Sequence, residues 1–120
     1  MVFTQAYAAA GNCQPSRACL ISGQYTPRHG VYAVGSTKRG KVELMRLLPI
    51  PNKDGLAPAD FTLPKAMKSA GYATGMFGKW HLSGPGGSKP EDHFDVVGVS
   101  GHSWGKKNEN DPKGIFAITE

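Results

Sequence analysis

The stretch from residue 13 to residue 23 reads CQPSRACLISG and predicts a helix that begins at a cysteine. Pro15 suits the first turn of a helix, where its missing N–H costs nothing. Gly23 predicts the end of this helix, because glycine readily adopts the left-handed conformation found there. Cys13 is therefore expected at a helix N-terminus, where free N–H groups favour an anion. Arg17 lies one turn further along the same face.

The two cysteines, Cys13 and Cys19, are not expected to form a disulfide. Six helical steps separate their Cα atoms by about 9 Å, whereas a disulfide needs roughly 7 Å or less. Two interpretations of Cys13 are open at this point. It is either a small packed hydrophobe or a nucleophile activated by the helix N-terminus and by Arg17.

Composition limits the chain to one small domain with many turns. It has 120 residues, of which 16 are glycine and 9 are proline. The net charge of +5 suits an anionic substrate but is too small and too dispersed to indicate nucleic-acid binding. No stretch is long and apolar enough to cross a membrane. The first residues, MVFTQ, lack the basic and apolar regions of a signal peptide.

The segments on either side of the quoted stretch differ in character. Residues 2–7 are rich in β formers and predict a short strand. Residues 24–60 contain many prolines and glycines and predict an irregular surface excursion. Lys38, Arg39 and Lys41 lie within it, either as a solvated loop or as a contact to an anionic substrate.

A second helix is predicted over residues 62–70, followed by a strand over residues 72–77. Thr62 can cap this helix, and Gly71 can end it. One face of it is apolar, with Leu63, Ala66, Met67 and Ala70. A helix that leads directly into a strand indicates an α/β layer architecture. Residues 115–120 are predicted to begin another helix.

The strand leads into a second informative stretch, GYATGMFGKWH, at residues 71–81. Lys79 and His81 should point to the same side of an extended chain, because side chains alternate with a period of two. They fall at the C-terminal end of the predicted strand, where α/β folds place ligand sites. A cation beside an imidazole could bind a tetrahedral anion. The alternative is a surface lysine beside a packed tryptophan and histidine.

Taken together, the two stretches resemble the sulfatase family. Cys-x-Pro-Ser-Arg-x-x-Leu followed by Gly resembles the first sulfatase signature, and Gly-Tyr-x-Thr-x-x-x-Gly-Lys-Trp-His resembles the second, in the family's order. The flanking residues FTQAYA and GQYTPRHGV are also similar to the family. His93-Phe94-Asp95 resembles its Gly-Phe-Asp, with histidine in place of glycine. The resemblance covers most of residues 2–98.

This resemblance implies an α/β fold of the alkaline-phosphatase-like superfamily. It identifies residues 1–120 as an incomplete piece of a sulfatase catalytic domain, a three-layer fold truncated at both ends. Cys13 would be oxidised to formylglycine by a formylglycine-generating enzyme that reads Pro15 and Arg17. One hydroxyl of the hydrated aldehyde attacks sulfur and displaces an alcohol. The other then loses its proton and expels sulfate, which a serine could not do.

The resemblance also implies a role for each site residue. Arg17 would hold and polarise the diol. Lys79 would contact the sulfate oxygens, and His81 would hydrogen-bond the diol or assist its deprotonation. A divalent cation, usually calcium, would bind the formylglycine at position 13. The other metal ligands of the family, an early Asp-Asp pair and a later Asp-Asn pair, have no counterpart in this chain.

These implications give expectations for the whole protein and for the piece. The substrate would be a sulfated small molecule or carbohydrate, and the location periplasmic or secreted. The isolated chain is expected to be inactive, because metal ligands are missing, and poorly stable or oligomeric, because apolar surface and strand edges would be exposed.

Two other functions stay open on the sequence. One is a phosphoryl-transfer relative on the same fold, which would use serine or threonine as nucleophile; Cys13 with Pro15 and Arg17 argues against it. The other is a small basic module that binds polyanions through Lys38, Arg39 and Lys41, which predicts a steep salt dependence. The second function leaves both signatures unexplained.

Overall fold

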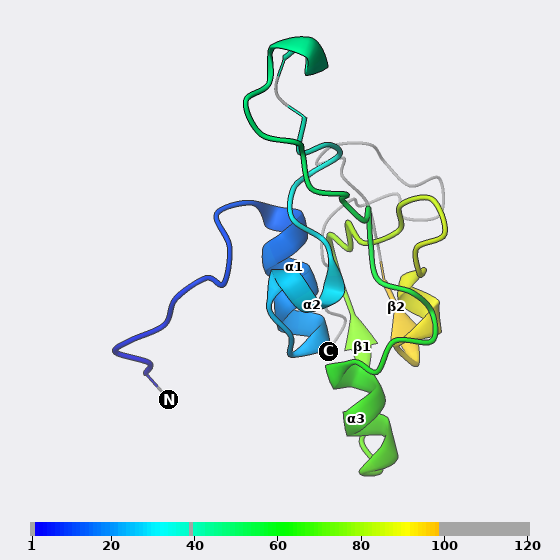
Figure 1. Ribbon diagram of the computed structural model, residues 1–120. Coiled ribbons are helices and arrows are strands. Elements are labelled where there is room, and N and C mark those ends of the chain that lie inside the picture. The colour runs from blue at the N-terminus through cyan, green and yellow to red at the C-terminus, as the bar shows by residue number, and fades with distance from the viewer. Residues whose placement is uncertain (1, 39, 99–120) are drawn as a thin grey trace, which may run out of the picture.

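The computed structural model describes residues 2–38 and 40–98, which form a mixed α/β arrangement (Figure 1). The elements in chain order are the helices α1 (Cys13–Ser22) and α2 (Thr26–His29), the 3-10 helix η1 (Val42–Leu44), the helix α3 (Leu63–Ser69), the strand β1 (Gly75–Met76), the 3-10 helix η2 (Pro90–Asp92) and the strand β2 (Val96–Val97). None of the helices in this part of the chain has the length and apolar character that a membrane crossing requires.

Helix α1 confirms the prediction from the first stretch. It begins at Cys13 and ends at Gly23, which has φ of 66° and donates its N–H to the carbonyl of Cys19 at 2.9 Å. Both cysteines are free thiols, as expected. Cys19 is buried and lies 3.3 Å from His29 Nε2, which joins α1 to α2. Burial, with a smaller effect of Lys53, lowers the pKa of His29, so this buried histidine is held neutral.

A small core forms around Trp80. The buried residues that make up this core are Ala18, Val31, Leu56, Trp80 and Leu82. The indole Nε1 of Trp80 donates to the carbonyl of Ser88 at 2.9 Å, which satisfies its one polar atom. Its ring packs edge-on against Phe94 and beside His93, with centroid distances of 6.1 Å and 5.4 Å. The core therefore fixes the chain on both sides of residue 80, next to Lys79 and His81.

Strands β1 and β2 form a parallel pair in which Gly75 lies opposite Val96 and Met76 opposite Val97. Asp95 secures this pair. Its carboxylate accepts hydrogen bonds from the Thr74 N–H and hydroxyl at 2.9 Å and 2.8 Å, and it forms an ion pair with Lys68 at 2.9 Å. The Lys68 and Thr74 hydrogen bonds lower the pKa of Asp95 to about 2. The strand predicted over residues 72–77 is shorter than expected, because only two residues of β2 pair with it.

One sequence prediction about strands was wrong. Residues 2–7 do not form a strand; no strand in the described residues pairs with them, and Val2, Phe3 and Tyr7 are exposed. The apolar face predicted for α3 is present, but Leu63 and Met67 on it remain exposed in the described part of the chain.

Helix α3 also begins in an unexpected way. Thr62 occupies the N-cap position but makes no capping bond with its side chain. Its hydroxyl lies 3.0 Å from Nδ1 of His93, a fully buried residue. Burial is the main cause that lowers the pKa of His93, which therefore stays neutral and can share a proton with the hydroxyl.

The irregular course predicted for residues 24–60 is confirmed, but their placement at the surface was wrong in part, because Val31 and Leu56 are buried in the core. Its described residues contain only α2 and η1 as regular elements, and the part around η1 projects from the rest of the chain (Figure 1). Asn52 links two distant parts of this segment, because the Oδ1 atom of Asn52 accepts hydrogen bonds from the N–H groups of Tyr32 and Ala33. The helix predicted for residues 115–120 lies outside the described residues.

Candidate active site

Cys13 stands exposed at the first position of α1. Asn12 precedes it in an extended conformation, with φ of −108° and ψ of 150°, and makes no side-chain cap. Pro15 is buried in the first turn and has no N–H to donate. The thiol of Cys13 thus lies at the positive end of the helix, open to a ligand from solution.

Lys79 and His81 converge on the sulfur of Cys13. Lys79 Nζ donates to Cys13 Sγ at 3.6 Å, and His81 Nδ1 lies 3.3 Å from the same atom. The two predicted site residues from the second stretch are therefore brought to the one from the first stretch. Which partner carries the proton between Cys13 and His81 depends on the histidine tautomer.

Lys79 and His81 were predicted to face the same side because side chains alternate along a strand, but the backbone reaches this arrangement in another way. Strand β1 ends at Met76, before either residue. Gly78 has φ of 102°, and His81 has φ of 63°, a left-handed conformation that a non-glycine residue seldom adopts. These two positions turn the chain so that Lys79 and His81 both face Cys13. Such a costly conformation at a side chain in the site is typical of functional positions.

Arg17 fastens the second stretch to α1. One of its terminal nitrogens, Nη1, donates to the backbone carbonyl of Lys79 at 2.5 Å. Its Nε is buried and has no hydrogen-bond partner within the described part of the chain. The guanidinium therefore holds the backbone of Lys79 in place beside the helix that carries Cys13. This contact with a backbone carbonyl was not predicted from the sequence.

The charges around Cys13 favour an anion. Lys79 places its ammonium beside Cys13 Sγ. Arg17 places its guanidinium against the backbone carbonyl of Lys79. Together with the helix N-terminus, these cations can bind and stabilise a tetrahedral oxyanion.

The described residues around Cys13 do not provide a comparable site for a divalent metal ion. Among residues 2–38 and 40–98, no group of three or more His, Cys, Asp or Glu side chains is placed to hold a metal ion. Hard cations such as calcium require six to eight oxygen ligands. The residues near Cys13 therefore do not fit a calcium site by themselves.

A cavity of about 480 Å³ adjoins the site, and sequence reasoning missed the polar residues on its wall. It is lined by His81 and Trp80 and also by Gln14, Asp54 and Ser83. Gln14 occupies the variable position of the first motif, and Asp54 comes from the irregular excursion. Neither position carries a sequence signal, because only the fold brings the two together.

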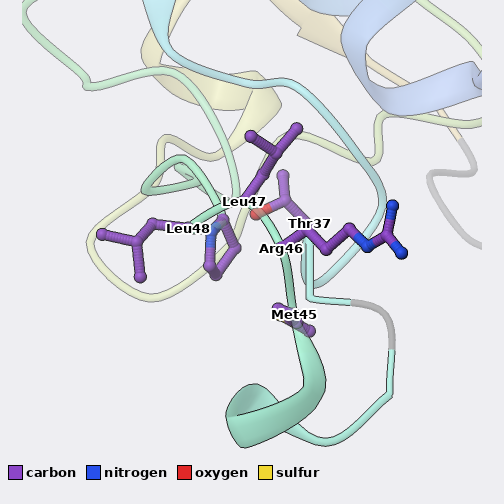
Figure 2. A pocket seen from close by; sticks show the side chains of 6 residues that line it. Thr37, Met45, Arg46, Leu47 and Leu48 are labelled. Carbon is purple, nitrogen blue, oxygen red and sulfur yellow. The ribbon is translucent and has the colours of Figure 1, made fainter.

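A second hollow, of about 400 Å³, lies on the excursion (Figure 2). Its walls are Thr37 and residues 45–49, and it includes none of the residues around Cys13. Leu47 and Leu48 are 84% and 91% exposed, so this hollow is open surface and not part of the site. The interpretation of Lys38 and Lys41 as contacts to a substrate gains no support from this hollow, and Arg39 lies outside the described residues.

Comparison with known proteins decides the family. A sequence model described as Sulfatase matches residues 1–114. The chain belongs to the sulfatase family. It is 39% identical over 103 residues to an arylsulfatase of Hemicentrotus pulcherrimus and 42% identical over 79 residues to a steryl-sulfatase of Mus musculus. It is also 34% identical over 93 residues to an N-acetylgalactosamine-6-sulfatase of Sus scrofa.

A solved structure also shares the fold of this chain. The crystal structure of Ps i-CgsB matches 79% of this chain with a TM-score of 0.52 and 27% sequence identity. The described residues thus form part of a sulfatase-like fold, with few helices and one small parallel sheet. The matches cover 80%, 66% and 78% of this chain for the three sulfatases named above, but only 17%, 12% and 16% of those proteins. They also cover 19% of the Ps i-CgsB chain.

Proposed function

We propose that this chain supplies the nucleophile and the sulfate contacts of a sulfatase that hydrolyses a sulfate ester. The observation that carries the proposal is the convergence of Lys79 Nζ and His81 Nδ1 on the sulfur of Cys13, at 3.6 Å and 3.3 Å. Family membership supplies the reaction class, since the family model matches residues 1–114. The fold class implied for the whole protein, a complete three-layer domain, is part of the same proposal.

In this proposal Cys13 is the precursor of formylglycine. Cys13 Sγ stands in for an oxygen of the hydrated aldehyde, which supplies one hydroxyl to attack sulfur and a second to release sulfate afterwards. The position suits that group, because Cys13 is exposed and two side chains already point at its Sγ. Pro15 and Arg17 complete the motif that a formylglycine-generating enzyme would read.

Each neighbouring side chain has a role that follows from its chemistry. The Lys79 ammonium neutralises negative charge that builds on the sulfate oxygens as the ester bond breaks. The His81 imidazole accepts a proton from a hydroxyl at position 13 or returns one. Arg17 fixes the backbone carbonyl of Lys79 and so holds that ammonium within reach of the reacting atoms.

The calcium ion implied by the family stays a prediction for the whole protein. Position 13 could provide one ligand, but the described residues offer no carboxylate cluster beside it. No step above depends on a metal. The periplasmic or secreted location is likewise proposed from the family alone.

The proposal predicts sulfate ester turnover by the full-length matured protein and none by residues 1–120 alone. Release of 4-nitrophenol from 4-nitrophenyl sulfate measures it. A full-length Cys13→Ala variant serves as the control and should be inactive, because it lacks the group that attacks sulfur. Release of phosphate from 4-nitrophenyl phosphate in place of sulfate would instead favour the phosphoryl-transfer alternative.

A further inference from the structure

Trp80 connects the buried core to the reacting centre. Lys79 precedes it and His81 follows it, and these two residues converge on Cys13 Sγ. The side chain of Trp80 belongs to the core. The backbone at His81 has a left-handed φ of 63°, a conformation that persists only where the surrounding structure enforces it. The contacts of the Trp80 ring therefore help to hold Lys79 and His81 in place.

His93 makes one of these contacts from a fully buried position. Its ring centroid lies 5.4 Å from that of Trp80, and the two ring planes meet at 38°. Its Nδ1 lies 3.0 Å from the hydroxyl of Thr62, which is itself buried at the N-cap of α3. Its Nε2 is buried and has no hydrogen-bond partner among the described residues. Thr62 is thus the residue that fixes the plane of this imidazole.

Packing alone does not explain a histidine at this position. A phenylalanine would give Trp80 a ring of similar shape and would bury no polar nitrogen, whereas an unpaired buried nitrogen is unfavourable. The ring is also neutral, because an imidazolium needs an acceptor at both nitrogens and Nε2 has none in the described part of the chain. What the histidine adds is a hydrogen bond that sets the orientation of the ring against Trp80.

The segment that carries His93 is fixed on both sides. Before it, η2 is closed by a hydrogen bond from the His93 N–H to the carbonyl of Pro90 at 3.0 Å. After it, the Asp95 carboxylate accepts a hydrogen bond from the Thr74 N–H, and β2 pairs with β1. The imidazole is therefore attached to a backbone that is tied to the strand leading toward Lys79.

We infer that His93 is a positioning residue for the proposed reaction. With its plane fixed by Thr62, it holds the ring of Trp80, and the backbone of Trp80 in turn keeps Lys79 and His81 against position 13. The inference rests on the proposed function and adds to the site two residues that lie outside both motifs. Neither His93 nor Thr62 meets the substrate, because both side chains are buried.

The first test separates the ring of His93 from its hydrogen bond, in the full-length matured protein acting on 4-nitrophenyl sulfate. His93→Asn can keep a hydrogen bond to Thr62 but removes the ring from Trp80. We expect kcat per folded molecule to fall about tenfold, because small displacements of catalytic groups are costly, while KM changes less than about twofold. His93→Phe keeps a ring against Trp80 and should lose less than about threefold in kcat.

His29→Asn is the matched control, because His29 is also buried and pairs with Cys19. It should lower the melting temperature and leave kcat within about twofold. An unchanged kcat in His93→Asn, or equal losses in His93→Asn and His93→Phe, would overturn the inference. An equal loss in His29→Asn would overturn it too, because the effect would then belong to buried histidines in general.

Thr62 tests how the ring is oriented. Thr62→Val removes the hydroxyl and keeps the shape, so it should lower kcat about threefold, whereas Thr62→Ser keeps the hydroxyl and should restore kcat. In the His93→Phe background, Thr62→Val should cost nothing further, because the polar pair is already gone. Equal losses with valine and serine would mean that the hydroxyl does not fix the ring, and the inference would be wrong.

A measurement without turnover tests the inference separately from the proposed function. The full-length protein is made without a formylglycine-generating enzyme, so that Cys13 stays a thiol, and its alkylation by iodoacetamide is followed by peptide mass. The Lys79 ammonium, 3.6 Å from Sγ, favours the reactive thiolate. Lys79→Gln and His93→Asn should each slow alkylation, and the double variant should be no slower than Lys79→Gln alone.

This pattern is expected even if the matured protein turns over no sulfate ester, a result that would refute the proposed function alone. Alkylation that is not slowed by His93→Asn would contradict the inference. A further slowing in the double variant would also contradict it, because His93 would then act on Cys13 by a route other than Lys79.

Discussion

A Cys13→Ser variant of the full-length protein is expected to release about one equivalent of alcohol and then stop. A serine hydroxyl beside Lys79 and His81 can attack the sulfur of the ester, since both side chains would contact it as they contact Cys13 Sγ. The sulfated serine then has no second hydroxyl on the same carbon to expel the sulfate. Steady-state turnover should fall by about 10³-fold or more, the scale on which a covalent nucleophile acts.

Rapid-quench measurement of the released alcohol, with the mass of the peptide that contains residue 13, checks this expectation. The peptide should carry one sulfate after the burst. Cys19→Ser is the matched control, because Cys19 is buried against His29 and away from solvent. It should keep multiple turnovers. Sustained turnover by Cys13→Ser would mean that the reaction does not pass through an aldehyde at this position.

The second large effect is expected from Lys79. Replacing it with glutamine retains most of the side-chain length and removes the positive charge 3.6 Å from Cys13 Sγ, the atom that stands in for the reacting oxygen. The charge that builds on the sulfate oxygens then loses a preorganised cation, and we expect kcat to fall by about 10²–10³-fold. A loss confined to KM would instead assign Lys79 to ground-state binding.

Steady-state kinetics on 4-nitrophenyl sulfate measure this effect. Lys89→Gln is a suitable control, because it removes the same charge at an exposed position before η2 and should leave kcat within about twofold. If both lysine variants lose activity equally, the overall charge of the chain matters more than the position of Lys79, and the assigned role is wrong.

The site was predictable from the sequence because its residues lie in two short stretches with strong local signals. Pro15 and Gly23 mark the two ends of α1, and the structure begins and ends this helix at the expected residues. The meeting of Lys79 and His81 with Cys13 also agrees with the prediction. The path of the chain differs from the prediction, because positive φ angles at Gly78 and His81, and not the alternation of side chains along a strand, bring Lys79 and His81 to Cys13.

The failures share one physical cause, which is dependence on distant partners. Residues 2–7 have β-forming side chains but find no strand to pair with in the described part of the chain. Leu63 and Met67 have the helical spacing that correctly predicts α3, yet both stay exposed among the described residues. Local patterns report what a segment can form, whereas pairing and burial depend on the rest of the fold.

Gln14 and Asp54 could not have been found for a related reason. Both residues line one cavity that only the fold assembles, and nothing in their spacing along the sequence indicates this. The low stability or oligomerisation expected for the isolated chain stays a prediction. The exposed apolar side chains of α3 are consistent with it, because such surfaces favour association.

The mass of the tryptic peptide that contains residue 13, taken from the protein as its native host makes it, tests the central claim most directly. Conversion of the thiol to an aldehyde predicts a peptide about 18 Da lighter than the encoded cysteine form, in a large fraction of active protein. Active protein in which Cys13 is present only as an unmodified thiol would contradict the account.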